Sequence, residues 1–470
     1  MPYIYTLNNY LIIWRNFIVS YLAIILFFGL FTDLNSSPMW SYFTLGIASL
    51  LGLKIFCHLF LKKIGFNAFA VVGGAFVFKM LFSTWHFLTF VQPEYFNGNT
   101  NYEFFYDFYW MHESIQYLSD EAHSVGFLNS MTKDFFLENK GALIFYTYSP
   151  IYYFGGNLVL NLSHINAVFT LFTAVLVTFI AKNFFDLSQK QLFATLILCS
   201  FFPFGMITSM TMRDFAGQFL IALGIISLQF SFKNPKLFFL LFVSGILFYL
   251  QRKNYIIVPF ATYLIFLFFY TKQSGLVKYG KKFNLRVVLL LTTIIVGFKY
   301  YQLATQSELI DVDSQLSSDY TSDLTQVQFY LLLPVYIFKG FLGPFPWSQF
   351  FKFTQETIYQ ISDYFTSTFI FTIIVVLWRK RKKLNGFKGE INVVTIASLI
   401  VSFAGIASGF MHLSYISISV IFLIPFVMKH MDLKYFLRNY MAVFILFVGL
   451  SILWVGFGLY GEGNWSKFRS

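Results

Sequence analysis

The chain has 470 residues, of which 57% are hydrophobic and only 11% are charged. A soluble core could not enclose that much apolar surface, and the mean hydropathy of +0.65 agrees. Repeated apolar runs of about 17–25 residues can cross a bilayer as helices, and their continuous rather than alternating pattern argues against membrane-spanning strands. The sequence therefore predicts an all-α, polytopic transmembrane protein.

The net charge of +12 does not indicate nucleic acid, because Lys and Arg collect in the cytoplasmic loops of membrane proteins. Three segments are strongly basic, at 272–286, 379–388 and 429–438, and we place them inside. Two longer segments, at 94–140 and 301–325, are acidic, and we place them outside.

The first spans are predicted near 11–32, 39–61 and 66–91. They carry the chain from a cytoplasmic N-terminus to the acidic outer segment. Lys62 and Lys63 then lie in an inside turn, as the excess of basic residues in cytoplasmic loops requires.

The next apolar stretch, ALIFYTYSPIYYFGGNLVLNL at 142–162, precedes a span predicted at 164–182. Only one crossing fits between the outer loop and the following inside turn. Residues 142–162 are therefore predicted to enter the bilayer and return, or to lie at its interface. Pro150 and the pair Gly155 and Gly156 are expected to break a straight helix there.

Further spans are predicted at 191–211, 214–231, 237–250, 255–271, 287–300, 366–378, 391–411, 413–428 and 439–460. The total is about 13 helices of spanning length, in one integral membrane domain over residues 1–470, with the C-terminus outside. Residues 94–162 and 301–365 form two outer loops. The second contains the PFPW sequence and is predicted to stay outside or to dip into the bilayer.

This topology places Arg213, Arg252 and Lys253 on the outer side, as exceptions to the positive-inside pattern. Arg213 has Asp214 beside it, and the two can simply pair. Arg252 and Lys253 have no adjacent acid, so they either extend toward lipid head groups or bind an anion. Arg matches the geometry of phosphate oxygens, and Lys adds a point charge.

The outer segment YDFYWMHESIQYLSDEAHSVGF at 106–127 brings Asp107, His112 and Glu113 close together in sequence. A carboxylate at the membrane surface can take a proton from an acceptor hydroxyl or bind a metal. His112 can contact phosphate or orient the carboxylate. The alternative is an amphipathic surface helix with solvated charges, and the spacing alone favours that alternative.

Several segments resemble membrane glycosyltransferases of the GT-C superfamily, of the bacterial mannosyltransferase and aminoarabinose-transferase type. Asp107-x4-His112 resembles their D-x3-YH start, with Met111 in place of the usual Tyr. YTYSPIYYFGGNLVLNLSHINAVFTLFTAVLV resembles their Y…P…Y…G…N segment. SFFPFGMITSMTMRDF, LQRKNY and GFLGPFPW resemble later segments that are shared with O-antigen and other polysaccharide polymerases. The resemblance covers residues 100–350.

The resemblance implies a GT-C-like fold and transfer of a sugar from a polyprenyl-phosphate-linked donor. The acceptor would be a glycan, lipid or protein on the outer face of the cell inner (plasma) membrane. Asp107 would act as general base or as the ligand of a divalent metal, which is the only cofactor implied. His112 would assist, and Glu113 is a candidate second acid.

The resemblance also gives a role to the outer basic residues. Arg213, Arg252 and Lys253 would hold the leaving phosphate and neutralise the charge that develops on it. Aromatic side chains would stack on the sugar or shape the lipid groove, although an interfacial aromatic belt gives the same pattern. These aromatic residues are Tyr148, Tyr152 and Trp347.

Two alternatives remain open from the sequence. A polysaccharide polymerase of the O-antigen type would join polyprenyl-pyrophosphate-linked repeat units on the same leaflet, and it could rely on arginines without an essential carboxylate. A flippase for lipid-linked sugars, or another transporter, would need charges that line a path from both sides. The unexplained charges cluster on one side, which disfavours transport. Lys79 falls in the middle of a predicted span and has no role in any of these schemes.

Overall fold

The computed structural model describes residues 7–32, 37–62, 64–92, 94–97, 106–126, 142–185, 187–202, 214–233, 239–240, 243, 246–247, 355–380 and 421–456. Every regular element in these ranges is a helix, which confirms the all-α prediction for this part of the chain. The spans predicted at 255–271, 287–300 and 391–411 lie outside the described residues.

The chain divides into two compact units. The first consists of Met1–Asn254, Phe353–Ser362 and Ile424–Leu433, and the second consists of Tyr255–Lys352, Asp363–Leu423 and Lys434–Ser470. The prediction of one membrane domain over the whole chain stays a prediction.

Five described helices are long and apolar enough to cross a membrane. They are α1 (Leu7–Phe31), α2 (Pro38–Leu61), α3 (Ala68–His86), α8 (Val159–Phe184) and α20 (Leu433–Gly456). The sequence predicted a span at each of these places. The helices thus indicate a membrane protein, while the larger number of spans and the orientation stay predictions.

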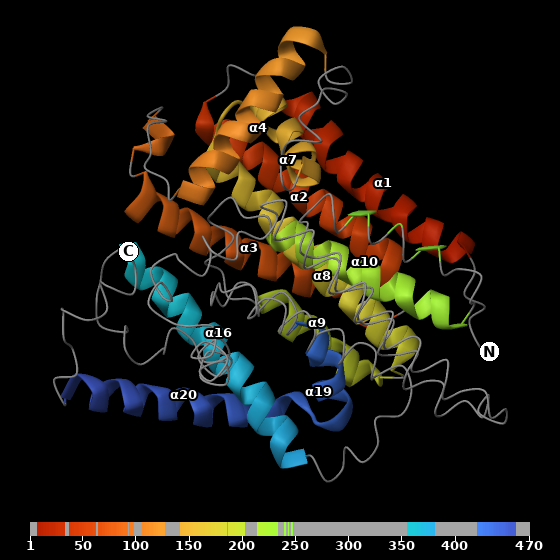
Figure 1. Ribbon diagram of the computed structural model, residues 1–470, viewed down its shortest axis with the longest axis vertical. Coiled ribbons are helices and arrows are strands. Elements are labelled where there is room, and N and C mark those ends of the chain that lie inside the picture. Colours follow the sequence, from red (N-terminus) through yellow and green to blue (C-terminus); the bar gives the residue numbers. More distant parts are fainter. Residues whose placement is uncertain are drawn as a thin grey trace, which may run out of the picture. The chain divides into compact units, whose positions relative to one another are not determined.

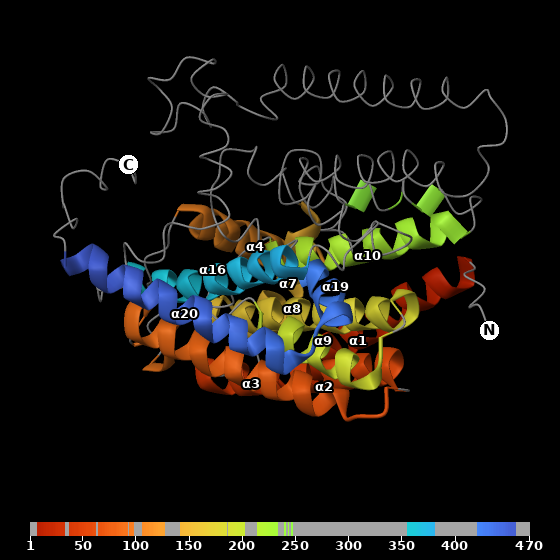
Figure 2. The same cartoon turned by 90° about the horizontal axis from the view of Figure 1, so that it is seen from below.

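Helix α8 is the centre of the first unit. It packs against α2, α3, α9 (Gln189–Phe201) and α10 (Asp214–Lys233). Figure 1 and Figure 2 show α8 between α2 and α3 on one side and α10 on the other. In consequence, 94% of the most apolar stretch of α8 is buried.

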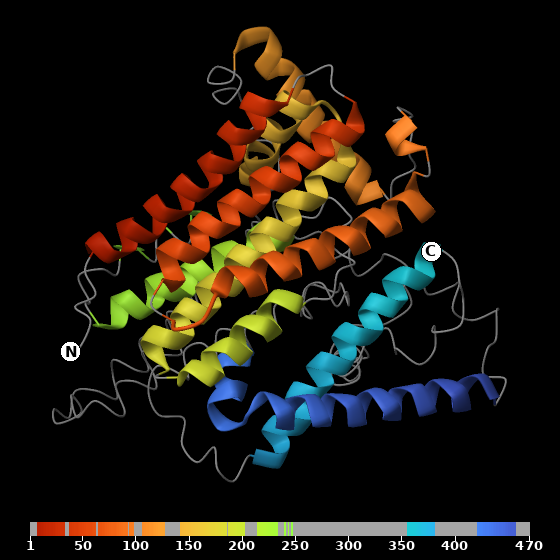
Figure 3. The ribbon, with the colours of Figure 1, turned by 180° about the vertical axis from the view of Figure 1, so that it is seen from behind.

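Aromatic rings join the helices around α8. Phe56 of α2 stacks on Phe172 of α8 with ring centroids 4.0 Å apart. Phe17 of α1 lies 4.6 Å from Phe219 of α10 and 6.0 Å from Phe172. Such offset and edge-on ring pairs add to the dispersion energy of the contact, so this cluster ties four helices together. Figure 3 shows α1 and α2 side by side on the opposite face.

Two helix boundaries differ from the predictions. The span predicted at 191–211 is interrupted, because α9 ends at Phe201 and Phe202 is extended. Phe202 precedes Pro203, and a residue before proline is disfavoured in the α conformation. Pro150, in contrast, lies inside the helix α7 (Ala142–Gly155) and does not end it. The predicted break occurs at Gly156, whose φ of 71° favours glycine.

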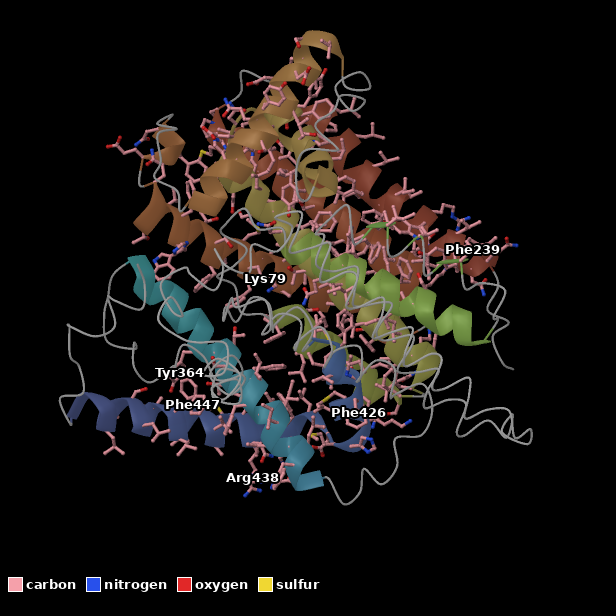
Figure 4. All side chains as sticks on the ribbon, in the orientation of Figure 1. Lys79, Phe239, Tyr364, Phe426, Arg438 and Phe447 are labelled. Carbon is pink, nitrogen blue, oxygen red and sulfur yellow. The ribbon has the colours of Figure 1, made fainter. Side chains whose placement is uncertain are left out.

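In the second unit, α20 packs against α16 (Gln355–Lys380). Tyr364 donates a hydrogen bond to the Phe444 carbonyl at 3.3 Å, and its ring lies 6.2 Å from that of Phe447. Tyr364 and Phe447 are close to each other in Figure 4. Arg379 Nη1 donates to Asn439 Oδ1 at 2.6 Å. Apolar packing and these two polar contacts therefore fix the helix pair.

Short elements complete the described chain. The π-helix η1 (Phe87–Val91) continues α3, and a 3-10 turn, η2 (Tyr95–Asn97), follows it. A second 3-10 turn, η8 (Ile421–Leu423), precedes α19 (Ile424–His430). In the first unit, α19 packs on α9, where Gln191 Nε2 donates to the Lys429 carbonyl at 3.3 Å.

Gly52 allows α1 and α2 to approach closely. A Cβ at Gly52 would lie 2.3 Å from Ile24 Cγ1 and 3.0 Å from the Ser20 carbonyl oxygen. We expect Gly52→Ala to destabilise the protein by about 1–3 kcal/mol, the usual cost of overpacking. A Cβ at Gly74 of α3 would meet nothing within 4 Å, so Gly74→Ala should be neutral or stabilising by up to about 1 kcal/mol.

Thermal unfolding of the detergent-solubilised variants measures the difference. Equal stability of the two alanine variants would contradict the close approach of α1 and α2.

Candidate functional site

Helix α4 (Tyr106–Val125) covers the segment in which the sequence placed the acidic cluster. Its buried positions lie along one side of the helix: His112, Ser114, Ile115, Leu118, Ser119 and Ala122. Glu113 and Asp120 are exposed. The helix is therefore amphipathic, as the alternative of a surface helix predicted, but it turns His112 toward the protein.

His112 meets α7, the helix against which α4 packs. Its Nδ1 lies 2.7 Å from the Tyr152 hydroxyl oxygen, and the two rings are edge to face with centroids 5.5 Å apart. A second ring pair joins the same helices, because His123 stacks on Tyr153 at 4.1 Å with an interplanar angle of 11°. The two segments that carry the first two parts of the GT-C resemblance are thus in direct contact.

The His112 imidazole is held in its neutral form. Burial lowers the pKa of His112 from 6.5 to about 4, although the Glu113 carboxylate acts in the opposite direction. A neutral imidazole has one nitrogen that donates and one that accepts. Paired with the Tyr152 hydroxyl, the neutral ring can hold a substrate hydroxyl, which is the task of a positioning group.

The position of Tyr152 is fixed because α7 folds back along α8. The Tyr148 hydroxyl of α7 donates to Asn166 Oδ1 of α8. The Tyr21 hydroxyl of α1 donates to the Thr147 carbonyl. With 14 residues, α7 is about 21 Å long, shorter than the hydrocarbon core of about 30 Å. It therefore packs inside the bundle without the length to cross a bilayer.

A polar cluster holds the end of α7 against α2 and α8. Ser41 Oγ donates to the Gly155 carbonyl at 3.4 Å and accepts from Asn161 Nδ2 at 2.7 Å. A Cβ at Gly155 would lie 2.6 Å from Phe28 Cζ, so this position has no room for a side chain. One turn along α8, the ring of His164 lies 4.4 Å from that of Tyr42.

Apart from Gly155, these residues were not singled out in the sequence. The available signal was the run of Asn161, His164 and Asn166 in an otherwise apolar span, since polar side chains inside a membrane usually have a partner or a function. Their partners come from other helices, Ser41 and Tyr42 from α2 and Tyr148 from α7, and no local pattern points to these pairs.

The predicted site residues are only partly brought together. His112 and Tyr152 are in contact, and Glu113 is exposed next to His112 on α4. Tyr148 and Tyr152 are 0% and 1% exposed, and their roles toward a sugar or lipid stay predictions. The backbone of Asp107 lies in the first turn of α4, whereas its side chain lies outside the described residues. Four further predicted residues also lie outside them: Arg213, Arg252, Lys253 and Trp347.

Among the described residues, no group of three or more His, Cys, Asp or Glu side chains is placed to hold a metal ion. The metal predicted at Asp107 stays a prediction. Comparison with protein-family models, curated proteins and solved structures finds no match to this chain. A functional assignment must therefore be argued from the residues and their geometry.

The lowered pKa of His112 predicts a pH dependence of stability. His112 binds a proton near pH 6.5 in the unfolded chain but only near pH 4 in the folded chain. The free energy of unfolding should therefore fall as the pH drops from 6.5 to 4. Thermal unfolding in detergent across this range measures the slope. His112→Gln removes the titrating group and should flatten the slope.

His58→Gln is a matched control, because His58 is an exposed histidine of α2. The slope of stability against pH should change more from wild type to His112→Gln than from wild type to His58→Gln. Identical slopes for the two variants would show that His112 is not buried in its neutral form.

Proposed function

We propose that the chain is a membrane glycosyltransferase of the GT-C type. It transfers a sugar from a polyprenyl-phosphate-linked donor to a glycan, lipid or protein acceptor on the outer face of the membrane. The observation that carries the proposal is the hydrogen bond between His112 and Tyr152. It joins two segments that are 40 residues apart in sequence and that resemble successive parts of the GT-C pattern.

The chemistry fits that contact. Transfer from a lipid phosphate requires an acceptor hydroxyl that loses a proton and a leaving phosphate that gains charge. Asp107 lies five residues before His112 in α4, about 7.5 Å along the helix axis. Asp107 acts as the general base or metal ligand, and the neutral imidazole of His112, oriented by Tyr152, positions the acceptor. Glu113 supplies further negative charge next to His112.

The lipid carrier supplies the leaving group, so the donor site needs positive charge rather than a nucleotide pocket. Arg213, Arg252 and Lys253 hold the leaving phosphate in this proposal. Tyr148 is buried against α8 and holds α7 in place. The fully buried Tyr152 orients His112. Trp347 would stack on the sugar.

Profiles of lipid-linked glycans in cells test the proposal. Cells that express Asp107→Asn should accumulate the polyprenyl-linked sugar, because loss of a general base lowers turnover by about 100-fold or more. His112→Gln should show a weaker accumulation. Asp120→Asn, which changes an exposed acid on the same helix, should match wild type at equal expression.

The same profiles separate the alternatives. Accumulation in Arg252→Ala cells but not in Asp107→Asn cells would replace the transferase by a polymerase that joins lipid-linked repeat units without an essential carboxylate. Wild-type profiles for Asp107→Asn, His112→Gln and Arg252→Ala, each folded and in the membrane, would reject this site.

A further inference from the structure

Helix α3 carries polar side chains along one buried face. Lys79, Ser83 and His86 are spaced four and three residues apart, which places them on the same side of the helix. All three are 0% exposed, and Figure 4 marks the place of Lys79. The other buried positions of α3 are apolar or glycine. Such residues in a spanning helix are costly and usually serve a function, so this buried face, the α3 stripe, needs an explanation.

The surroundings of the α3 stripe suit an anion. The helices α2, α8 and α9 pack against α3, and none of the four contains an Asp or Glu. An anion beside the stripe therefore meets no repelling carboxylate from these helices. A hydroxyl pair lies next to the stripe, since Tyr42 Oη and Thr84 Oγ1 are 2.5 Å apart.

The His86 end of the α3 stripe reaches the connection between α7 and α8. His86 is followed by the π-helix η1, an irregularity that is often found at functional sites. Phe87 of η1 packs with Leu158 and Val159, which join α7 to α8. From His86 to Lys79 the stripe extends about 10 Å along α3. The α3 stripe thus leads from the end of α7, the helix that contains Tyr152, into the bundle.

We propose that Lys79, Ser83 and His86 form a second phosphate site inside the helical bundle, separate from Arg213, Arg252 and Lys253, and that it binds a polyprenyl-linked lipid. An ammonium group has three donors, a hydroxyl one, and an imidazole two nitrogens, so each side chain can hold a protein partner and a phosphate oxygen together. A charge-assisted contact from Lys79 supplies most of the affinity. The choice of a polyprenyl lipid rests on the proposed function, whereas the anion site does not.

Binding to the purified full-length protein in phosphate-free detergent tests the proposal. Native mass spectrometry measures the bound fraction of three probes: polyprenyl phosphate, the polyprenol of the same length, and inorganic pyrophosphate. Lys79→Met should weaken binding of polyprenyl phosphate by about tenfold or more. The polyprenol should bind weakly and equally to both proteins. Lys54→Met, at an exposed lysine of α2, should bind polyprenyl phosphate like wild type.

Ser83→Ala gives a second test that does not remove a charge, and it should weaken binding of polyprenyl phosphate about threefold, the loss of one hydrogen bond. If pyrophosphate alone binds in a Lys79-dependent way, the phosphate site stands and its ligand is a free anion. Wild-type binding of polyprenyl phosphate by a folded Lys79→Met or Ser83→Ala protein overturns the proposal.

The binding assay involves no sugar transfer, so its result is independent of the glycan profiles. Asp120→Asn, at an exposed acid of α4, should bind polyprenyl phosphate as wild type does. A Lys79-dependent binding with unchanged glycan profiles in the Asp107→Asn cells would keep the phosphate site and reject the transferase.

Discussion

Helix α8 has to satisfy its polar side chains inside an apolar bundle, and the packing of the first unit depends on how it does so. Thr170, Thr173 and Thr178 donate to carbonyls of their own helix at 2.8–2.9 Å, which needs no neighbour. Asn161 and Asn166 instead reach Ser41 of α2 and Tyr148 of α7. Hydrogen bonds between helices in membranes contribute only about 0.6 kcal/mol each, so their direction matters more than their strength. These hydrogen bonds fix the orientation of α2 and α7 on α8, which apolar contacts alone would define less specifically.

The candidate site is an extension of this network. Because Tyr148 anchors α7 to α8, the next turn of α7 presents Tyr152 to His112 of α4. An amphipathic helix that could otherwise lie anywhere on the membrane surface is thus placed over one position of the bundle. The burial that lowers the pKa of His112 is a result of this placement, so the chemistry of the ring depends on contacts two helices away.

The sequence predicted the elements better than their contacts. Continuous apolar runs were sufficient to locate α1, α2, α3, α8 and α20, because length and hydropathy alone decide whether a helix can span. The end of α9 was predictable from Phe202 and Pro203, yet a long apolar run obscured it. Pro150 indicated a break that does not occur, since α7 continues through it to Gly155.

The site was harder to predict than the elements. His112 was chosen from its resemblance to a motif and Tyr152 from another, but their hydrogen bond joins residues 40 positions apart, which no local spacing encodes. Asn166 and Ser41 were missed because their partners come from separate helices. Lys79 was visible from sequence as a charge within a span, whereas its alignment with Ser83 and His86 became meaningful only once all three proved buried.

The π-helix after α3 has an evolutionary consequence. The Gln92 amide donates to the Phe87 carbonyl at 2.8 Å, five residues back, so η1 holds one residue more than an α-helical turn would. Losing one residue between Phe87 and Val91 would restore the α pattern and rotate everything after it by about 100° around the axis of α3. The residues of α3 therefore determine its buried face, whereas η1 determines the direction in which the chain leaves the helix. An insertion or deletion between Phe87 and Val91 could redirect the segment that follows α3 in a descendant protein without disturbing the interior of the bundle.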